Sequence, residues 1–185
     1  MGAAGISRST GAVRDCGCSS RYGACSVRGV PRSRVKTTVD AIDLLRQDHD
    51  RVAKAFKEFE RIDRQDAEAC RRLVHEACEA LKVHTAIEEE IFYPAVREAI
   101  NDGDLMNEAA VEHETAKMLI DQLDYMAPDD PNYYATFTVL GEYVRHHVKQ
   151  EQDEIFPAAK RAKVDLAALG ERMRARKEEL AGELA

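Results

Sequence analysis

The sequence predicts an all-α fold, an up-down-up-down four-helix bundle with a disordered N-terminal tail and an extra C-terminal helix. Charged residues make up 33% of the 185 residues, Trp is absent, and Ala, Glu, Leu, Arg and Lys recur throughout, as is typical of helical proteins. Apolar residues recur in steps of three and four over four long segments, which places them on one face of each helix. Short connections with Gly, Asp and Pro (NDGD, APDDP) separate these segments and favour antiparallel neighbours.

The bundle is expected over residues 37–160, and each helix is defined by one apolar stripe. The four stripes run from Ile42 to Phe59, from Cys70 to Ala95, from Met106 to Ala127 and from Phe137 to Ala158. The related segments HTAIEEEIFYP and HVKQEQDEIFP lie in the second and fourth stripes, which indicates an ancient repeat of helix pairs. Within residues 161–185, an amphipathic segment from about Leu166 to Leu180 predicts the extra helix, which packs outside the bundle or extends free.

Residues 1–36 form a basic tail with a net charge of +6 and no helical or strand period. Nothing in it could build a core, so we interpret it as disordered, or as an artefact of gene prediction. Its Arg- and Ser-rich, acid-poor composition also fits a transit peptide. The spacing of Cys16, Cys18 and Cys25 matches no usual zinc pattern.

The remainder of the chain carries a net charge of −13, which argues against nucleic acid as a partner. No apolar run approaches the roughly 18–20 residues of a transmembrane helix, so no membrane partner is expected. Five cysteines are an odd number, and Cys70 and Cys78 lie too far apart along one helix to bridge. We therefore expect a reducing, cytoplasmic location, with the chain as a monomer or a homodimer.

Six metal-ligating side chains interrupt the apolar stripes in the middle of the helices: His49, His84, Glu88, His113, His147 and Glu151. An unpaired carboxylate in a bundle core costs on the order of several kcal/mol, and every helix contributes at least one of the six. A pair of divalent cations would account for all of them, because imidazole nitrogens and bridging carboxylates suit iron. The His-x-x-x-Glu spacing places one nitrogen and one carboxylate a turn apart on the same face. His75 and His146 are expected near the surface.

These segments resemble the haemerythrin family, in its HHE cation-binding branch, over roughly residues 40–158. The resemblance rests on QDHD around His49, HTAIEEEIFYP, EHE around His113 and HHVKQEQDEIFP. It implies a four-helix bundle that holds two non-haem iron ions with an oxo or hydroxo bridge. By this analogy the four histidines are terminal ligands, and Glu88 and Glu151 are the bridges.

Two positions depart from the oxygen-carrying members. In the fourth helix Glu151 stands where they have Asp, a difference to which we give little weight. The other departure is in the third helix, where they have a second histidine one turn after the first. Here that position is Lys117, and lysine is a poor ligand unless deprotonated. Water, Glu112, Glu114 or Tyr143 could fill the vacant position. We interpret the aromatic–proline ends, Phe92-Tyr93-Pro94 and Phe156-Pro157, as packing and kink elements rather than chemistry.

The sequence therefore predicts a di-iron binding protein whose ligand is a small diatomic molecule or peroxide. The preferred interpretation is a protein that senses or buffers oxygen, nitric oxide or iron. The alternative is an enzyme that decomposes hydrogen peroxide in a catalase-like reaction or reduces nitric oxide. A zinc-filled or metal-free interaction module is a third possibility. The residues alone leave the choice between binding protein and enzyme open.

Overall fold

A computed structural model describes residues 39–183, which belong to one compact unit. The predicted tail, with its three cysteines, lies outside the described residues. Within this range the chain forms α-helices and two π-helical turns and no strand. These elements are α1 (Ala41–Phe59), α2 (Ala67–Ile87), η1 (Glu88–Phe92), α3 (Tyr93–Ala99), α4 (Gly103–Tyr125), α5 (Tyr133–Gln150), η2 (Glu151–Ile155), α6 (Phe156–Arg161) and α7 (Leu166–Glu183).

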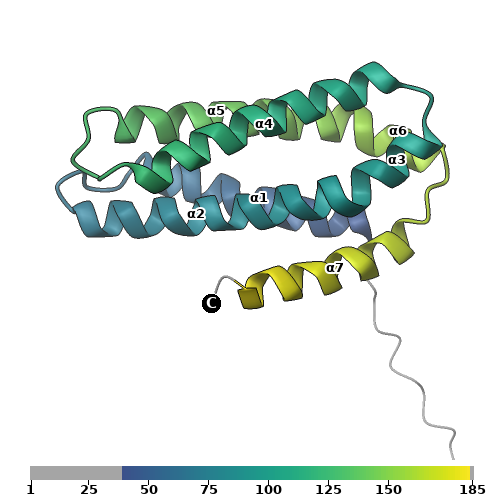
Figure 1. The fold of residues 1–185 in the computed structure, drawn as a ribbon, viewed down its shortest axis with the longest axis horizontal. Coiled ribbons are helices and arrows are strands. Elements are labelled where there is room, and N and C mark those ends of the chain that lie inside the picture. Colours follow the sequence, from purple (N-terminus) through teal and green to yellow (C-terminus); the bar gives the residue numbers. More distant parts are fainter. Residues whose placement is uncertain (1–38, 184–185) are drawn as a thin grey trace, which may run out of the picture. The chain divides into compact units, whose positions relative to one another are not determined.

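Four long helices form the bundle, because α2, η1 and α3 run on without a break, as do α5, η2 and α6. The first helix packs against α2 and α5, and α4 packs against the same two helices from the other side. Consecutive long helices are joined by short connections and run antiparallel (Figure 1). The predicted four-helix bundle and its additional C-terminal helix are confirmed.

Aspartates precede the first residue of four helices. The side chains of Asp40, Asp66, Asp102 and Asp165 precede α1, α2, α4 and α7, and each accepts a hydrogen bond from the backbone N–H three residues later. These bonds satisfy N–H groups that have no partner within the helix. The third stripe ends earlier than predicted: α4 stops at Tyr125 and Ala127 is exposed. Ala127 precedes a proline, a position that disfavours helical backbone.

The π-helical turns lie where the sequence repeat places a glutamate six residues before a proline. The N–H of Tyr93 donates to the carbonyl of Glu88, and the N–H of Phe156 donates to that of Glu151, each across five residues. Proline lacks an N–H, and its ring crowds the carbonyl one turn earlier. A wider turn relieves this crowding, so the predicted kinks take the form of π-helical turns, which are frequent at functional sites.

Two apolar clusters fill the bundle, one on each side of the level of the histidines. The first includes Ile42, Leu45, Phe92, Met106 and Phe156. The second includes Val52, Phe56, Leu81, Ile120, Phe137 and Leu140. Along α1 the first cluster ends before His49 and the second begins after it. The polar side chains therefore form one layer between two apolar layers, which shield it from water at both ends.

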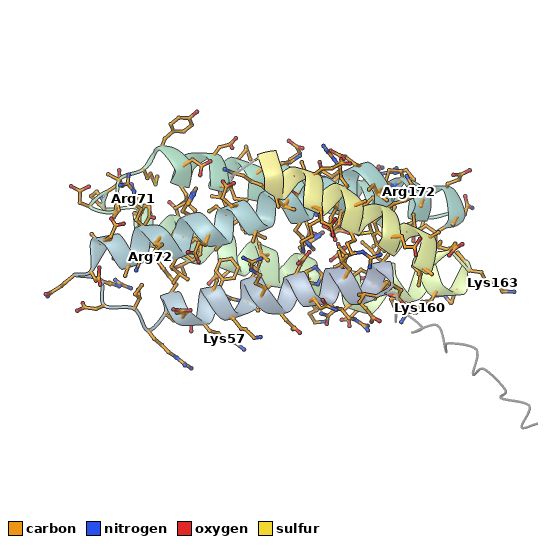
Figure 2. The ribbon with its side chains drawn as sticks, turned by 90° about the horizontal axis from the view of Figure 1, so that it is seen from below. Lys57, Arg71, Arg72, Lys160, Lys163 and Arg172 are labelled. Atoms are coloured by element: carbon orange, nitrogen blue, oxygen red, sulfur yellow. The ribbon has the colours of Figure 1, made fainter. Side chains whose placement is uncertain are left out.

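The last helix, α7, lies against α1, α2 and η1, and Figure 2 shows it in front of the bundle. Its buried residues Leu169 and Met173 belong to the first apolar cluster. Basic side chains such as Lys57, Lys163 and Arg172 point away from the core in the same view. Among residues 39–183, no helix combines the length and the apolar character needed to cross a membrane.

Candidate metal centre

The six predicted ligands come from all four long helices and meet in the polar layer. His49 lies in the middle of α1 and His113 in the middle of α4. The other four follow the sequence repeat, with a histidine near the end of an α-helix and a glutamate at the start of a π-helical turn: His84 with Glu88, and His147 with Glu151. All six are buried. As predicted, His75 and His146 are exposed.

The side chains fall into two groups, and in each group one ligand atom per residue lies within 4.8 Å of the others. The first group contains His49, His84, Glu88 and Glu151. The Nε2 atoms of the two histidines are 3.1 Å apart. The Nε2 of His49 lies 3.1 Å from Oε2 of Glu151, and the Nε2 of His84 lies 3.2 Å from Oε2 of Glu88.

The second group contains Glu88, His113 and His147. Its two histidine Nε2 atoms are 3.0 Å apart, and Oε2 of Glu88 lies 3.4 Å from Nε2 of His113. Glu88 thus belongs to both groups. Glu151 reaches towards the second group too, with Oε2 3.9 Å from Nε2 of His147. The carboxylates of both glutamates therefore lie between the two histidine pairs.

The charges of these groups are unbalanced without cations. Glu88 and Glu151 have no exposed area, and neither carboxylate oxygen of Glu88 has a hydrogen-bond partner. Burial raises the pKa of Glu88 well above its ordinary value, and the negative charge of Glu151 raises it further. For Glu151, burial also opposes ionisation, but the hydrogen bond with His49 and the charges of the histidines outweigh it and lower the pKa. Buried, unpaired carboxylate oxygens facing imidazole nitrogens are the donor set that a pair of cations requires.

Two of the histidines, His84 and His113, are held in the neutral form that suits metal binding. Burial lowers the pKa of His84, and burial together with the charge of His147 lowers that of His113 to about 4. A neutral imidazole keeps a lone pair for a metal. Burial also acts against protonation of His147, but the hydrogen bond and charge of Glu112 outweigh it and raise the pKa.

Tyr93 is a member of the centre that the sequence interpretation missed. Its hydroxyl lies 3.3 Å from Nε2 of His113 and 3.0 Å from Nε2 of His147, and it donates a 3.0 Å hydrogen bond to Oε1 of Glu151. Burial, and then the charges of Glu151 and Glu88, raise the pKa of Tyr93. The sequence interpretation gave Phe92-Tyr93-Pro94 packing and kink roles only, and did not anticipate these polar contacts of the Tyr93 hydroxyl. The π-helical turn that begins at Glu88 directs this side chain inward, and a proline after an aromatic residue does not reveal that direction.

Lys117, which stands at the position of the missing histidine, lies at the rim. Its Nζ pairs with Glu89 at 3.1 Å and with Glu114. Glu112 also stays outside the two groups, since it holds Nδ1 of His147 at 2.7 Å. Tyr143 is 45% exposed. Of the protein side chains considered for the vacant position, none occupies it, and the hydroxyl of Tyr93 reaches both histidines instead.

Three of the histidines have a carboxylate behind the ring, and each carboxylate contacts a basic side chain. His113 Nδ1 lies 2.9 Å from Glu89, which pairs with Lys117. His147 Nδ1 lies 2.7 Å from Glu112, which His146 approaches at 3.3 Å.

On α1, Oδ2 of Asp48 lies 3.7 Å from Nδ1 of His84, and its other oxygen contacts Lys177. Burial works against ionisation of Asp48, but its bonds with His84 and Lys177 prevail, and its pKa is lowered. Such carboxylates orient metal-binding imidazoles with Nε2 facing the metal.

A small cavity adjoins the centre, with a volume of about 20 Å³. Its lining combines histidines of both groups with apolar side chains that include Val52, Leu81, Ala116, Ile120 and Val144. A volume of this size holds one water-sized molecule.

Comparisons with known proteins agree with this geometry. Residues 40–159 match the family model described as Hemerythrin HHE cation binding domain. A curated relative, a DNA nickase from Nostoc sp., is 28% identical over 123 residues, which are 66% of this chain. The aligned segment spans only 34% of the length of that relative. A crystal structure of a Hemerythrin HHE cation binding domain-containing protein from Mycobacterium kansasii superposes with a TM-score of 0.68 at 24% identity. It covers 78% of this chain and 89% of its own, and it supports the fold alone.

Proposed function

The chain belongs to the haemerythrin HHE cation-binding family, and from this premise we propose that it is a non-haem di-iron protein that handles or senses oxygen, nitric oxide or iron. Two iron ions with an oxo or hydroxo bridge would lie between the two groups. His49, His84, His113 and His147 would be the terminal ligands, and Glu88 and Glu151 the bridging ones.

The position of Glu88 carries this proposal. Its Oε2 lies 3.2 Å from the Nε2 of His84 in one group and 3.4 Å from the Nε2 of His113 in the other. Neither of its oxygens has a hydrogen-bond partner, although the side chain has no exposed area. A carboxylate buried in this way is costly unless a cation compensates it. Because Glu88 faces both histidine pairs, two cations fit better than one.

The donor set favours iron over softer metals. Neither group contains a cysteine, and the donors are imidazole nitrogens and carboxylate oxygens, with a phenol at the second group. Thiolate ligands would point to zinc or copper, whereas nitrogen and oxygen donors with open positions are typical of non-haem iron. The free thiols of Cys70 and Cys78 are buried elsewhere in the bundle, which supports the inference of a reducing location such as the cytoplasm.

The protein would contribute positioning, exclusion of water and proton handling, while bound iron would supply the redox chemistry. Glu89 and Glu112 hold the rings of His113 and His147 with Nε2 turned inward. The two apolar layers keep bulk water from the centre. The small cavity would limit entry to molecules with about two non-hydrogen atoms, such as oxygen, nitric oxide or hydrogen peroxide. The acidic charge argues against nucleic acid as a partner, so the activity named for the Nostoc relative is not extended to this chain.

Decomposition of hydrogen peroxide is the second candidate, and the hydrogen bond from Tyr93 to Glu151 favours it. Peroxide chemistry requires a proton to be given to and taken from oxygen atoms inside the centre. A phenol that donates at 3.0 Å to a buried carboxylate can hold such a proton within reach of the cavity.

Anaerobic iron reconstitution tests both candidates. We expect about two irons per chain, counted by emission spectrometry, and then optical changes on adding oxygen, nitric oxide and hydrogen peroxide separately. Bleaching that reverses on degassing would support oxygen handling, whereas sustained oxygen release from peroxide would support the enzyme. A chain that binds no more than one iron, or binds zinc in preference when both are offered, would contradict the di-iron proposal.

A further inference from the structure

The C-terminal helix α7 lies outside residues 40–159, the range that matches the family model, yet it is fixed against the bundle close to the centre. Met173 has no exposed area and Leu169 is 5% exposed, both within the first apolar cluster. At Gly170 an added Cβ would lie 2.7 Å from the carbonyl oxygen of Val39 and 2.8 Å from the N atom of Ala41. The absence of a side chain at this position lets α7 touch the start of α1, which fixes its register.

This register brings Lys177 to Asp48, the residue next to His49. The ammonium group contacts Oδ1 of Asp48. The other oxygen, Oδ2, faces Nδ1 of His84 at 3.7 Å. Both of these facing atoms are buried and neither has a hydrogen-bond partner. When Nε2 of His84 binds a cation, the ring proton must reside on Nδ1, where Asp48 is the carboxylate available to accept its hydrogen bond.

We propose that Lys177 is a positioning residue for the metal centre: through Asp48, α7 fixes the orientation and the protonated nitrogen of His84. The proposal rests on the proposed function in taking His84 as a ligand. Lys177 itself touches neither the six ligands nor the cavity of the centre. Its contribution is to hold the Asp48 carboxylate in place behind the ring of His84, from a helix that is not part of the four-helix bundle.

A neighbouring ion pair also holds α7 to the bundle, but through an exposed carboxylate, and it serves as a comparison for the contact of Lys177. Arg176 pairs with Glu90 at 2.7 Å, and the side chain of Glu90 is 46% exposed. Exposed pairs of this kind contribute little. The side chain of Asp48 is only 12% exposed, and removing the partner of a buried carboxylate leaves it uncompensated. Both contacts hold α7 to the bundle, but only that of Lys177 also supports a carboxylate behind a histidine of the centre.

The test compares Lys177→Met, Lys177→Arg and Arg176→Met in the full chain. On the iron-loaded proteins, the rate of iron release to a chelator should rise about tenfold in Lys177→Met, the lower end of the effect of losing support behind a metal-binding histidine. Lys177→Arg keeps the positive charge, so its rate of iron release should lie closer to that of the wild type. Arg176→Met should release iron at the wild-type rate. Equal acceleration in Lys177→Met and Arg176→Met would mean that only helix docking matters, and this would overturn the proposal.

The metal-free proteins give a second readout that does not depend on iron. Long-range nitrogen–proton spectra, assigned with His84→Gln, report which ring nitrogen of His84 carries the proton. In the wild type and in Arg176→Met we expect the proton on Nδ1. In Lys177→Met we expect this preference to weaken. An unchanged His84 signal in Lys177→Met would contradict the proposal, and a wild-type chain that binds no iron would contradict only the proposed function.

Discussion

Glu88 and Glu151 each begin a π-helical turn, in two different long helices, and both side chains are completely buried. The wider turn allows the helix to continue past a proline while the preceding glutamate faces the core. The same local structure therefore appears twice, once for each of these buried glutamates. The prolines contact no ligand, but the π-helical turns that accommodate them orient the two carboxylates.

Removing either bridging carboxylate should reduce iron binding. We expect Glu88→Gln to retain less than one iron per chain, because Glu88 belongs to both groups. Glu151→Gln should lose iron as well. Metal counting after reconstitution measures the outcome. Glu154→Gln, which changes an exposed carboxylate in the same turn as Glu151, is the control and should keep two irons. Full occupancy in both buried variants would refute the bridging assignment.

The same carboxylate should destabilise the protein when no metal is bound. In the folded, metal-free state the pKa of Glu88 lies above its ordinary value of 4.5, so the folded state holds its proton to a higher pH than the unfolded state does. The stabilisation from this group is therefore present at low pH. It is lost as the pH rises from the pKa of Glu88 in the unfolded chain to its higher pKa in the folded chain, by up to about 1.4 kcal/mol per pH unit.

Glu88→Gln lacks this titration, so metal-free Glu88→Gln should be more stable than the wild type at pH 8. Urea unfolding of both proteins between pH 5 and pH 8 would measure the difference. Because Glu88 and Glu151 lie close enough to affect each other's ionisation, the difference reports the titration of this pair. A gap between the two proteins that stays constant with pH would show that Glu88 ionises normally in the folded chain.

The sequence was sufficient for the bundle and for bringing the six ligands together, because helical period fixes the face on which a residue lies. His84 and Glu88 had to share a face whatever the tertiary structure. The same reasoning failed for Tyr93, since the π-helical turn adds a residue to the helix and rotates everything after it. It was silent on Asp48 and Lys177, because the path of α7 depends on close contact at Gly170 rather than on any period.

Tyr93→Phe tests the role of the phenol. The histidines and carboxylates remain, so we expect close to two irons per chain. The optical spectrum of the iron-loaded protein should change, and its reaction with peroxide should slow about 10-fold or more, as for the loss of a proton-handling group. Tyr143→Phe is the matched control, because Tyr143 also borders the cavity but is 45% exposed. If Tyr143→Phe alters the spectrum and Tyr93→Phe does not, Tyr143 fills the vacant position.

Lys117→Met tests whether Lys117 is a metal ligand or only an ion-pair partner of the glutamates at the rim. In the structure Lys117 pairs with Glu89 and Glu114 at the rim, and its side chain is 34% exposed. We expect two irons per chain and only a small acceleration of iron release, since an exposed ion pair contributes little. Glu89→Gln should act more strongly, because Glu89 contacts Nδ1 of His113 directly. Loss of one iron in Lys117→Met would instead identify Lys117 as a ligand.

The size of the cavity should determine which peroxides react. About 20 Å³ beside the histidines accommodates hydrogen peroxide but not tert-butyl hydroperoxide. Ile120, which is 1% exposed and lines the cavity, limits that space. Stopped-flow decay of the iron absorbance gives the rate with each peroxide. In Ile120→Ala we expect the ratio of the rate with hydrogen peroxide to the rate with tert-butyl hydroperoxide to fall about tenfold or more. This corresponds to roughly the 1–3 kcal/mol by which apolar pockets discriminate between ligands.

Ile42→Ala removes an equally buried side chain from the other apolar cluster at a similar cost of about 2–5 kcal/mol in stability. The control should keep the wild-type preference, because it loosens the core without opening the cavity. If both variants admit the larger peroxide equally, general loosening of the bundle, and not the cavity beside His49 and His147, controls access.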